Sequence, residues 1–89
     1  MFAVLADPTR LRIIHELLDG ERTVTGLART VGITQSATSH QIAKLRDLGL
    51  VSSRREGTTI HYALASEHVS SFFREALYQA DHTVSGTTH

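Results

Sequence analysis

Cysteine is absent from this chain of 89 residues. Disulfides, thiolate metal sites and thiol redox switches are therefore excluded. Net charge is absent as well, because nine basic side chains balance nine acidic ones, so overall composition does not indicate a nucleic-acid partner. No apolar run approaches the roughly 20 residues that span a membrane, and no signal pattern opens the chain. We expect a cytoplasmic protein with no membrane partner.

A chain of this length makes one domain, near the size at which burial on folding is marginal, so subunit association is expected. Charge is unevenly distributed along it. Residues 34–60 carry four basic and two acidic side chains, whereas the residues beyond 65 carry one basic and three acidic ones. We predict a mildly basic face and a more acidic C-terminal helix.

The stretch from Thr34 to Leu50 predicts a helix with a polar outer face. Thr34 is a favoured N-cap, and Gly49 stands where a left-handed residue ends a helix. A buried stripe at three-residue spacing is predicted for Ile42, Leu45 and Leu48. The opposite side carries Gln35, Ser36, Ser39, His40 and Lys44. Such a face suits contact with base edges and phosphates in a major groove, and the alternative is an ordinary solvated face.

The flanking segments favour DNA binding. Residues 24–32 form a short apolar-periodic helix that ends in Gly32, and with the next helix they predict a helix-turn-helix. Residues 51–55 and 58–64 predict two strands around Glu56 and Gly57. The fold class is therefore mainly α with a small β-hairpin, a winged helix-turn-helix. Arg54 and Arg55 on the hairpin suit phosphate contact, and the alternative is a solvated pair beside Glu56.

The first twenty residues are predicted to be scaffold. Asp7 is a favoured N-cap and Pro8 a favoured first residue of a helix, and residues 1–6 resemble the end of an earlier helix. A wide apolar stripe is predicted for Leu11, Ile13, Ile14, Leu17 and Leu18. The solvated side of the same helix is predicted to carry Arg10, Arg12, His15 and Glu16.

The C-terminal segment predicts a dimerisation helix over about residues 67–82, capped by Ser66. Its apolar side is wide enough to face both its own core and a partner chain. One stripe at intervals of four, three, four and three carries His68, Phe72, Glu75, Gln79 and His82. Two such helices, paired antiparallel, would bring His68 of one chain near Gln79 and His82 of the other. The predicted domain covers residues 1–82, and residues 83–89 are expected to form a flexible tail.

The segments LADPTRLRIIHELLDGE, TQSATSHQIAKLRDLGLV and SRREGTTIHYAL resemble the ArsR/SmtB family of metal- and metalloid-responsive winged-helix transcriptional regulators. The resemblance runs from about Val4 to His82. It implies that Gln35, Ser36, Ser39 and His40 contact DNA. It also implies a metal site shared by the C-terminal helices of a dimer, in which His68 and His82 match family ligands.

This chain departs from the family pattern at two ligand positions. Ser66 stands where an Asp is usual and Gln79 where a second His is usual. A site made of His68, Gln79 and His82 offers nitrogen and oxygen, which suits Ni(II) or Zn(II), with nickel preferred because octahedral coordination accepts more oxygen ligands. The family's alternative Cys-x-Cys site is expected to be absent, since Thr23 and Thr25 occupy it.

The predicted function is a homodimeric regulator that binds a double-stranded operator with an affinity modulated by the metal. Three alternatives remain. His68 and His82 can be polar residues at a dimer seam, the effector can be a non-metal ligand or a partner protein, or the domain can bind proteins without a DNA role. We do not expect an enzyme, because the chain has no His-Glu-x-x-His motif, no Gly-rich phosphate loop and no nucleophile paired with a base.

Overall fold

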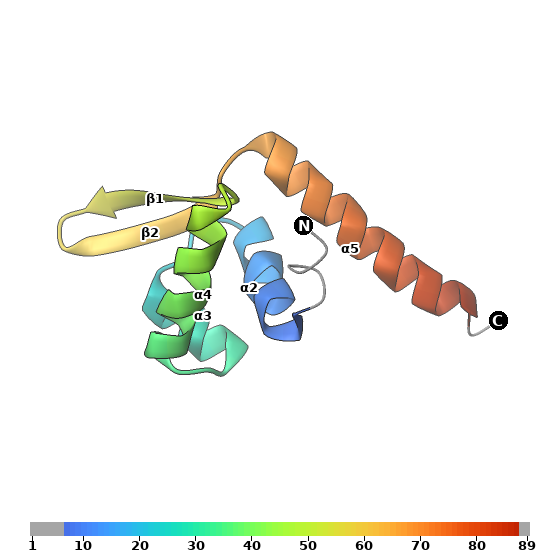
Figure 1. The fold of residues 1–89 in the computed structure, drawn as a ribbon, viewed down its shortest axis with the longest axis horizontal. Helices are drawn as coiled ribbons and strands as arrows, with labels where there is room; N and C mark the ends of the chain where they lie inside the picture. Colours follow the sequence, from blue (N-terminus) through green and yellow to red (C-terminus); the bar gives the residue numbers. More distant parts are fainter. Residues whose placement is uncertain (1–6, 88–89) are drawn as a thin grey trace.

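The computed structural model describes the backbone of residues 7–87 and the side chains of residues 7–79. The elements follow in the order α2 (Pro8–Leu18), α3 (Val24–Val31), α4 (Gln35–Asp47), β1 (Val51–Glu56), β2 (Thr59–Leu64) and α5 (Glu67–Thr87). Helices α2 to α4 form the body, from which the hairpin and α5 project in opposite directions (Figure 1). The predicted winged helix-turn-helix is confirmed. The earlier helix predicted over residues 1–6 lies outside the described residues.

Helix α2 begins as its sequence predicts. The Asp7 carboxylate accepts hydrogen bonds from the backbone amides of Thr9 and Arg10 at 3.0 and 3.2 Å, and Pro8 occupies the first turn. These contacts satisfy amides that would otherwise lack a partner at the helix start. The backbone amide of Arg10 and the charge of its guanidinium hold the pKa of Asp7 below its ordinary value of 3.8.

Replacing Asp7 with alanine should lower the free energy of unfolding by about 0.5 to 2 kcal/mol at neutral pH, the usual cost of losing an N-cap. Because folding lowers the pKa of Asp7, its contribution is present above the unfolded value and is lost as the pH falls through the folded one. Urea unfolding between pH 7 and pH 2 measures this loss. Asp19→Ala is the control, because Asp19 is exposed at the other end of α2. Equal losses in both variants would contradict a capping role.

The two helices of the helix-turn-helix are also set by local rules. The Thr34 hydroxyl caps α4 by accepting from the Ala37 amide at 3.0 Å, and Gly32 ends α3 with a left-handed φ of 82°. The buried residues of α4 are Thr38, Ile42 and Leu45. The prediction that Leu48 continues this stripe is wrong. Helix α4 ends at Asp47 and Leu48 is 57 % exposed, because the chain turns away at Gly49.

The wing is an antiparallel hairpin in which Val51 pairs with Leu64 and Glu56 with Thr59. Gly57 occupies the turn with a φ of 64°, as its position predicts. The backbones of Arg22 and Tyr62 exchange hydrogen bonds of 2.9 and 2.8 Å, which join the loop after α2 to the inner half of β2. The base of the wing is therefore fixed to the helical body.

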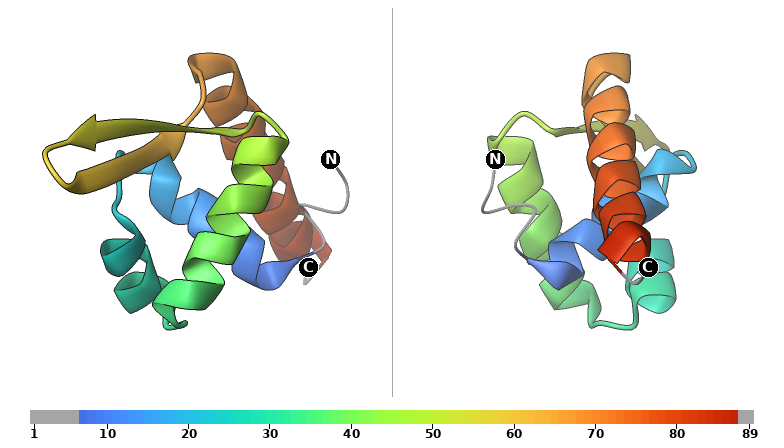
Figure 2. Two further views of the ribbon diagram at one scale, coloured as in Figure 1. Left: turned by 60° about the vertical axis from the view of Figure 1, so that its left-hand side comes forward. Right: turned by 90° about the vertical axis from the view of Figure 1, so that its right-hand side faces the viewer.

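A single core lies between α2, α3, α4, the base of the wing and α5. Its largest fully buried side chain is Phe73 of α5. Helix α5 contacts α2 and extends away from the body (Figure 2). Ser66 caps α5 by accepting from the Val69 amide at 3.2 Å. The helix continues to Thr87, past the end near His82 that the sequence predicts. Within the described residues, no helix is long and apolar enough to cross a membrane.

Candidate nucleic-acid interface and metal positions

The outer face of α4 is exposed along its whole length. The exposed residues include all five that the sequence placed there, namely Gln35, Ser36, Ser39, His40 and Lys44. Within the part of the chain that the structure describes, these side chains have no hydrogen-bond or ion-pair partner. Unpaired donors and acceptors on the first turns of a helix can meet base edges without breaking an internal contact.

Contacts behind α4 fix how this face is presented. The Arg10 guanidinium donates from Nε to the side-chain oxygen of Gln41 at 2.9 Å, and its side chain is only 13 % exposed. Arg12 donates from Nη2 to the carbonyl of Val31 at 2.7 Å, at the end of α3. The prediction that Arg10 lies on the solvated side is therefore wrong, whereas Arg12 is exposed as predicted. Both arginines hydrogen-bond to another helix, Arg10 to Gln41 of α4 and Arg12 to the last residue of α3.

Thr38 is a buried polar residue that the sequence pattern did not predict. Its side chain is fully buried, and its hydroxyl donates to the Thr34 carbonyl at 2.8 Å. The hydroxyl therefore has its partner inside the helix, which allows a polar residue to occupy the core side of α4. Its position four residues before Ile42 on the helix is the only sequence signal that could have revealed it.

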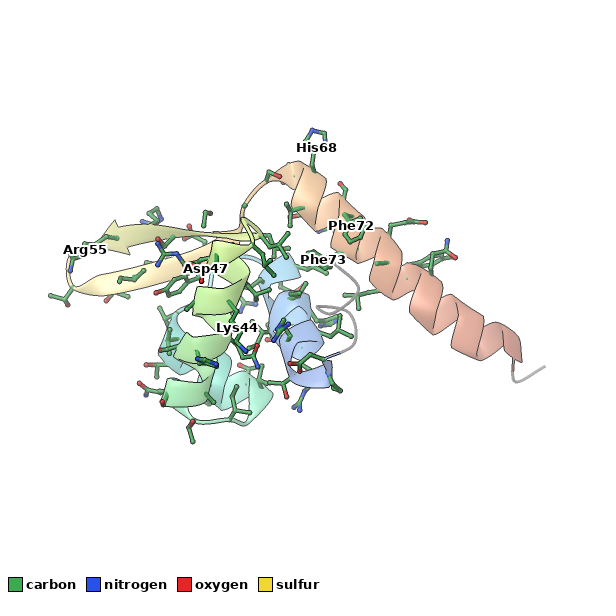
Figure 3. All side chains as sticks on the ribbon, in the orientation of Figure 1. Lys44, Asp47, Arg55, His68, Phe72 and Phe73 are labelled. Atoms are coloured by element: carbon green, nitrogen blue, oxygen red, sulfur yellow. The ribbon has the colours of Figure 1, made fainter. Side chains whose placement is uncertain are left out.

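The two arginines of the wing differ in their surroundings. Arg54 donates to both carboxylate oxygens of Glu21, at 3.1 Å from Nε and 2.7 Å from Nη2, and lies 3.5 Å from Glu56. The hydrogen bonds from Arg54 lower the pKa of Glu21, and the same carboxylate raises the pKa of Arg54. Arg55 is exposed near the tip of the wing and has no such partner among the described residues (Figure 3).

The residues suggested for a metal site lie on α5, and one protomer does not bring enough of them together. His68 is exposed near the start of the helix (Figure 3). Gln79 is exposed and donates from its amide nitrogen to the Glu75 carboxylate at 3.0 Å. The side chain of His82 lies outside the described residues. Among the described side chains, no group of three or more His, Asp or Glu residues could hold a metal ion.

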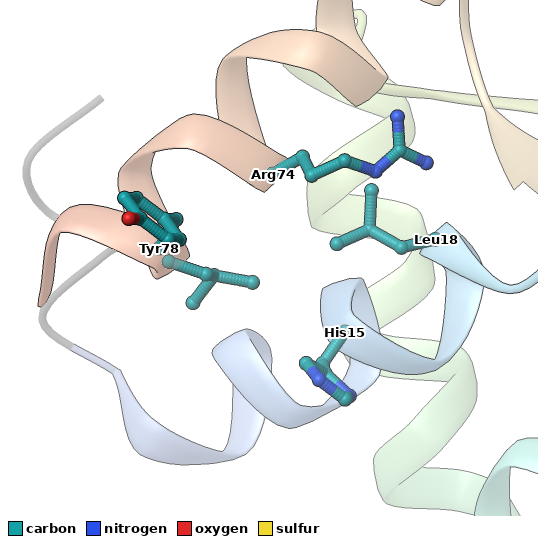
Figure 4. A pocket seen from close by; sticks show the side chains of 5 residues that line it. His15, Leu18, Arg74 and Tyr78 are labelled. Atoms are coloured by element: carbon teal, nitrogen blue, oxygen red, sulfur yellow. The ribbon is translucent and has the colours of Figure 1, made fainter. Parts of the chain in front are cut away.

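An open groove of about 510 Å³ lies between α2 and α5. Figure 4 shows His15 and Leu18 on one side of it and Arg74 and Tyr78 on the other, and Leu77 completes the lining. Its lining combines one cation, one imidazole and an apolar wall. The sequence did not indicate this groove, because its two sides lie almost sixty residues apart in the chain.

The chain is similar to known regulatory proteins in sequence and in structure. Residues 7–53 match the family described as "Bacterial regulatory protein, arsR family". The chain is 46 % identical over 78 residues to the HTH-type transcriptional regulator NmtR of Mycobacterium tuberculosis, covering 88 % of this chain and 65 % of that protein. It spans between about three fifths and two thirds of the length of the first curated relatives that it matches.

Solved structures agree in fold. The homodimeric winged helix-turn-helix domain of Mb0332 from Mycobacterium bovis superposes with a TM-score of 0.89 at 34 % identity, covering 99 % of this chain and 82 % of that one. The AntR antimony-specific transcriptional repressor superposes with a TM-score of 0.78 at 34 % identity, covering 94 % of this chain and 77 % of that one.

Proposed function

The chain belongs to the arsR family of bacterial regulatory proteins, and we propose that it is a cytoplasmic, homodimeric transcriptional regulator that binds a specific DNA operator. The exposed and unpaired polar face of α4, held beside a projecting wing, is the observation that carries this proposal. As a member of a family of regulatory proteins, the chain is not an enzyme.

In the proposed complex, the first turns of α4 enter the major groove. Gln35, Ser36, Ser39 and His40 contact base edges, because their side chains are short or flat and carry both donors and acceptors. Lys44 and Arg55 contact phosphates on either side of the groove. With few cations available per subunit, binding should weaken only moderately as salt increases.

Two observations support a dimer built on α5. Phe72 is 45 % exposed on this helix, so its ring is available to a partner chain. The Mb0332 domain with the same fold is a homodimer. Antiparallel pairing of two α5 helices would place His68 of one protomer near Gln79 and His82 of its partner, and symmetry would repeat the site.

We further propose that Ni(II) or Zn(II) binds these two equivalent positions and modulates operator affinity. The donor set is limited to imidazole nitrogen and to oxygen from Gln79, nearby carboxylates and water, since the chain has no thiolate. This chemistry fits a borderline divalent metal. It does not fit a soft metalloid such as the antimony named for AntR.

His68→Ala should bind nickel and zinc more weakly than the wild-type dimer in calorimetry, because the substitution removes one of the two imidazoles of the proposed site. The affinity of the wild type for either metal should also fall at acid pH, because imidazole coordinates a metal only in its neutral form. His61→Ala is the matched control, since His61 lies on the wing away from α5. If His68→Ala and the wild type bind both metals equally, the metal proposal fails.

A regulator that answers to a non-metal effector or a partner protein is the second candidate. The groove between α2 and α5 favours it, because a cation beside an apolar wall suits an organic acid and because α5 links this groove to the proposed dimer interface. A wild-type dimer that binds its operator and shows no calorimetric response to nickel, zinc or cobalt would support this candidate over the metal.

A further inference from the structure

The outer half of the wing is exposed to solvent, whereas the inner half of β2 packs against the helical body. In β1 only Val51 is buried, and the five residues after it are exposed. The backbone pairing of Arg22 with Tyr62 holds the inner half of β2. Beyond that point, the side-chain contact between Arg54 and Glu21 joins the wing to the loop after α2, across 33 residues of sequence.

The geometry of this contact restricts direction as well as distance. Both carboxylate oxygens of Glu21 accept from the planar guanidinium of Arg54, at 2.7 and 3.1 Å. A two-point contact of this kind resists rotation, whereas a single hydrogen bond leaves the strand free to swing. Glu21 lies only three residues after the end of α2, so its contact with Arg54 restrains the wing relative to the helical body.

Neighbouring residues of a strand point to opposite faces, so Arg54 and Arg55 have different roles available to them. Arg54 shares its face with Glu56 and with His61, its partner across the hairpin. Two carboxylates therefore surround its charge. Arg55 lies opposite Ile60 on the other face, near the tip, with no acidic partner among the described residues.

We propose that Glu21 is a positioning residue for DNA binding, which acts through Arg54 to fix the wing so that Arg55 reaches the phosphate backbone. This inference rests on the proposed DNA-binding function and assigns the two arginines different parts in it. Exposed ion pairs contribute little to global stability, so the loss of Glu21 should appear in DNA binding and not in unfolding.

Competition between Glu21 and DNA phosphate for Arg54 predicts the opposite change in DNA affinity. If Glu21 merely competed with phosphate for Arg54, its removal would release a cation toward DNA. Affinity would then rise, and binding would depend more steeply on salt, by about 0.9 in the logarithmic slope for each added phosphate contact. The sign of the change therefore separates positioning from competition.

The experiment measures fluorescence anisotropy with two probes, a duplex that the wild-type protein selects from a randomised pool and a duplex of scrambled sequence. Glu21→Ala should weaken binding to the selected duplex by about 3- to 10-fold and reduce the salt slope by about 0.9, the loss of one phosphate contact. Asp19→Ala is the control, because it removes one negative charge from the same loop and should change neither quantity.

DNA binding by Arg55 variants distinguishes a positioning role for Glu21 from a purely structural one. Arg55→Ala should produce the same loss as Glu21→Ala, and the double variant should lose no more than either single variant, although the two residues share no contact. Arg54→Lys should behave like Glu21→Ala, because lysine keeps the charge but not the two-point contact. Glu21→Gln, which keeps an acceptor oxygen, should lose less.

Additive losses in the double variant, unchanged binding by Glu21→Ala, or tighter binding by Glu21→Ala would each overturn the positioning role. Circular dichroism and urea unfolding of each variant confirm that the fold is retained. A wild-type protein that selects no duplex from the pool would instead overturn the proposed function itself, so the two failures are distinguishable.

Discussion

Replacing both Ser39 and His40 with alanine should remove sequence-specific DNA binding and leave non-specific binding largely intact. Both side chains are exposed on the early turns of α4 and have no partner among the described residues, so their donors and acceptors are available to bases. A good base contact contributes about 1 to 3 kcal/mol of discrimination, which gives a combined loss of about 2 to 6 kcal/mol. Anisotropy with selected and scrambled duplexes measures the ratio directly.

Lys44→Ala provides the contrasting variant. Lys44 lies on the same exposed face but farther along α4, where a cation meets phosphate more readily than a base. Its loss should weaken binding to both duplexes alike and lower the salt slope by about one. If a folded Ser39→Ala, His40→Ala double variant kept the wild-type ratio of affinities for the selected and scrambled duplexes, another surface would carry the sequence specificity.

The bounds of α4 were predictable from sequence because they depend on local chemistry. Thr34 caps α4 because its hydroxyl reaches the third amide of the helix, and Gly32 ends α3 because it adopts a left-handed conformation without steric cost. These rules act within a few residues. Leu48 shows their limit, since periodicity alone placed it in the core although the helix had already ended at Asp47.

Contacts between distant segments were not predictable in the same way. Arg10 hydrogen-bonds to Gln41, 31 residues later in the chain, and Arg54 hydrogen-bonds to Glu21, 33 residues earlier. No local sequence pattern predicts either pair. The sequence therefore indicated two equivalent arginines on the wing, whereas the structure distinguishes a paired Arg54 from Arg55. The metal positions stay predictions, because the side chain of His82 lies outside the described residues and the proposed site needs two protomers.

The neighbouring residues Phe72 and Phe73 should separate folding from dimerisation. Phe73 is fully buried and is the only α5 side chain, among those described, that enters the core completely. Phe73→Ala should lower the free energy of unfolding by about 3 to 5 kcal/mol, since it removes a large side chain and leaves a cavity. Domains of this kind are stable by about 5 to 15 kcal/mol, so the loss should be visible as a much lower urea midpoint.

Phe72 meets Phe73 edge to face at 5.2 Å between ring centroids but is 45 % exposed on the outer side of α5. Phe72→Ala should therefore change the unfolding free energy of the isolated protomer little. It should weaken dimerisation by more than about 1 kcal/mol, the loss typical of an aromatic residue that contributes strongly to an interface. Sedimentation across a range of concentrations measures the dissociation constant, and urea unfolding at matched concentrations keeps the two effects apart, because dimerisation itself adds apparent stability. A Phe72→Ala variant that dimerises like the wild type would place the interface away from this face of α5.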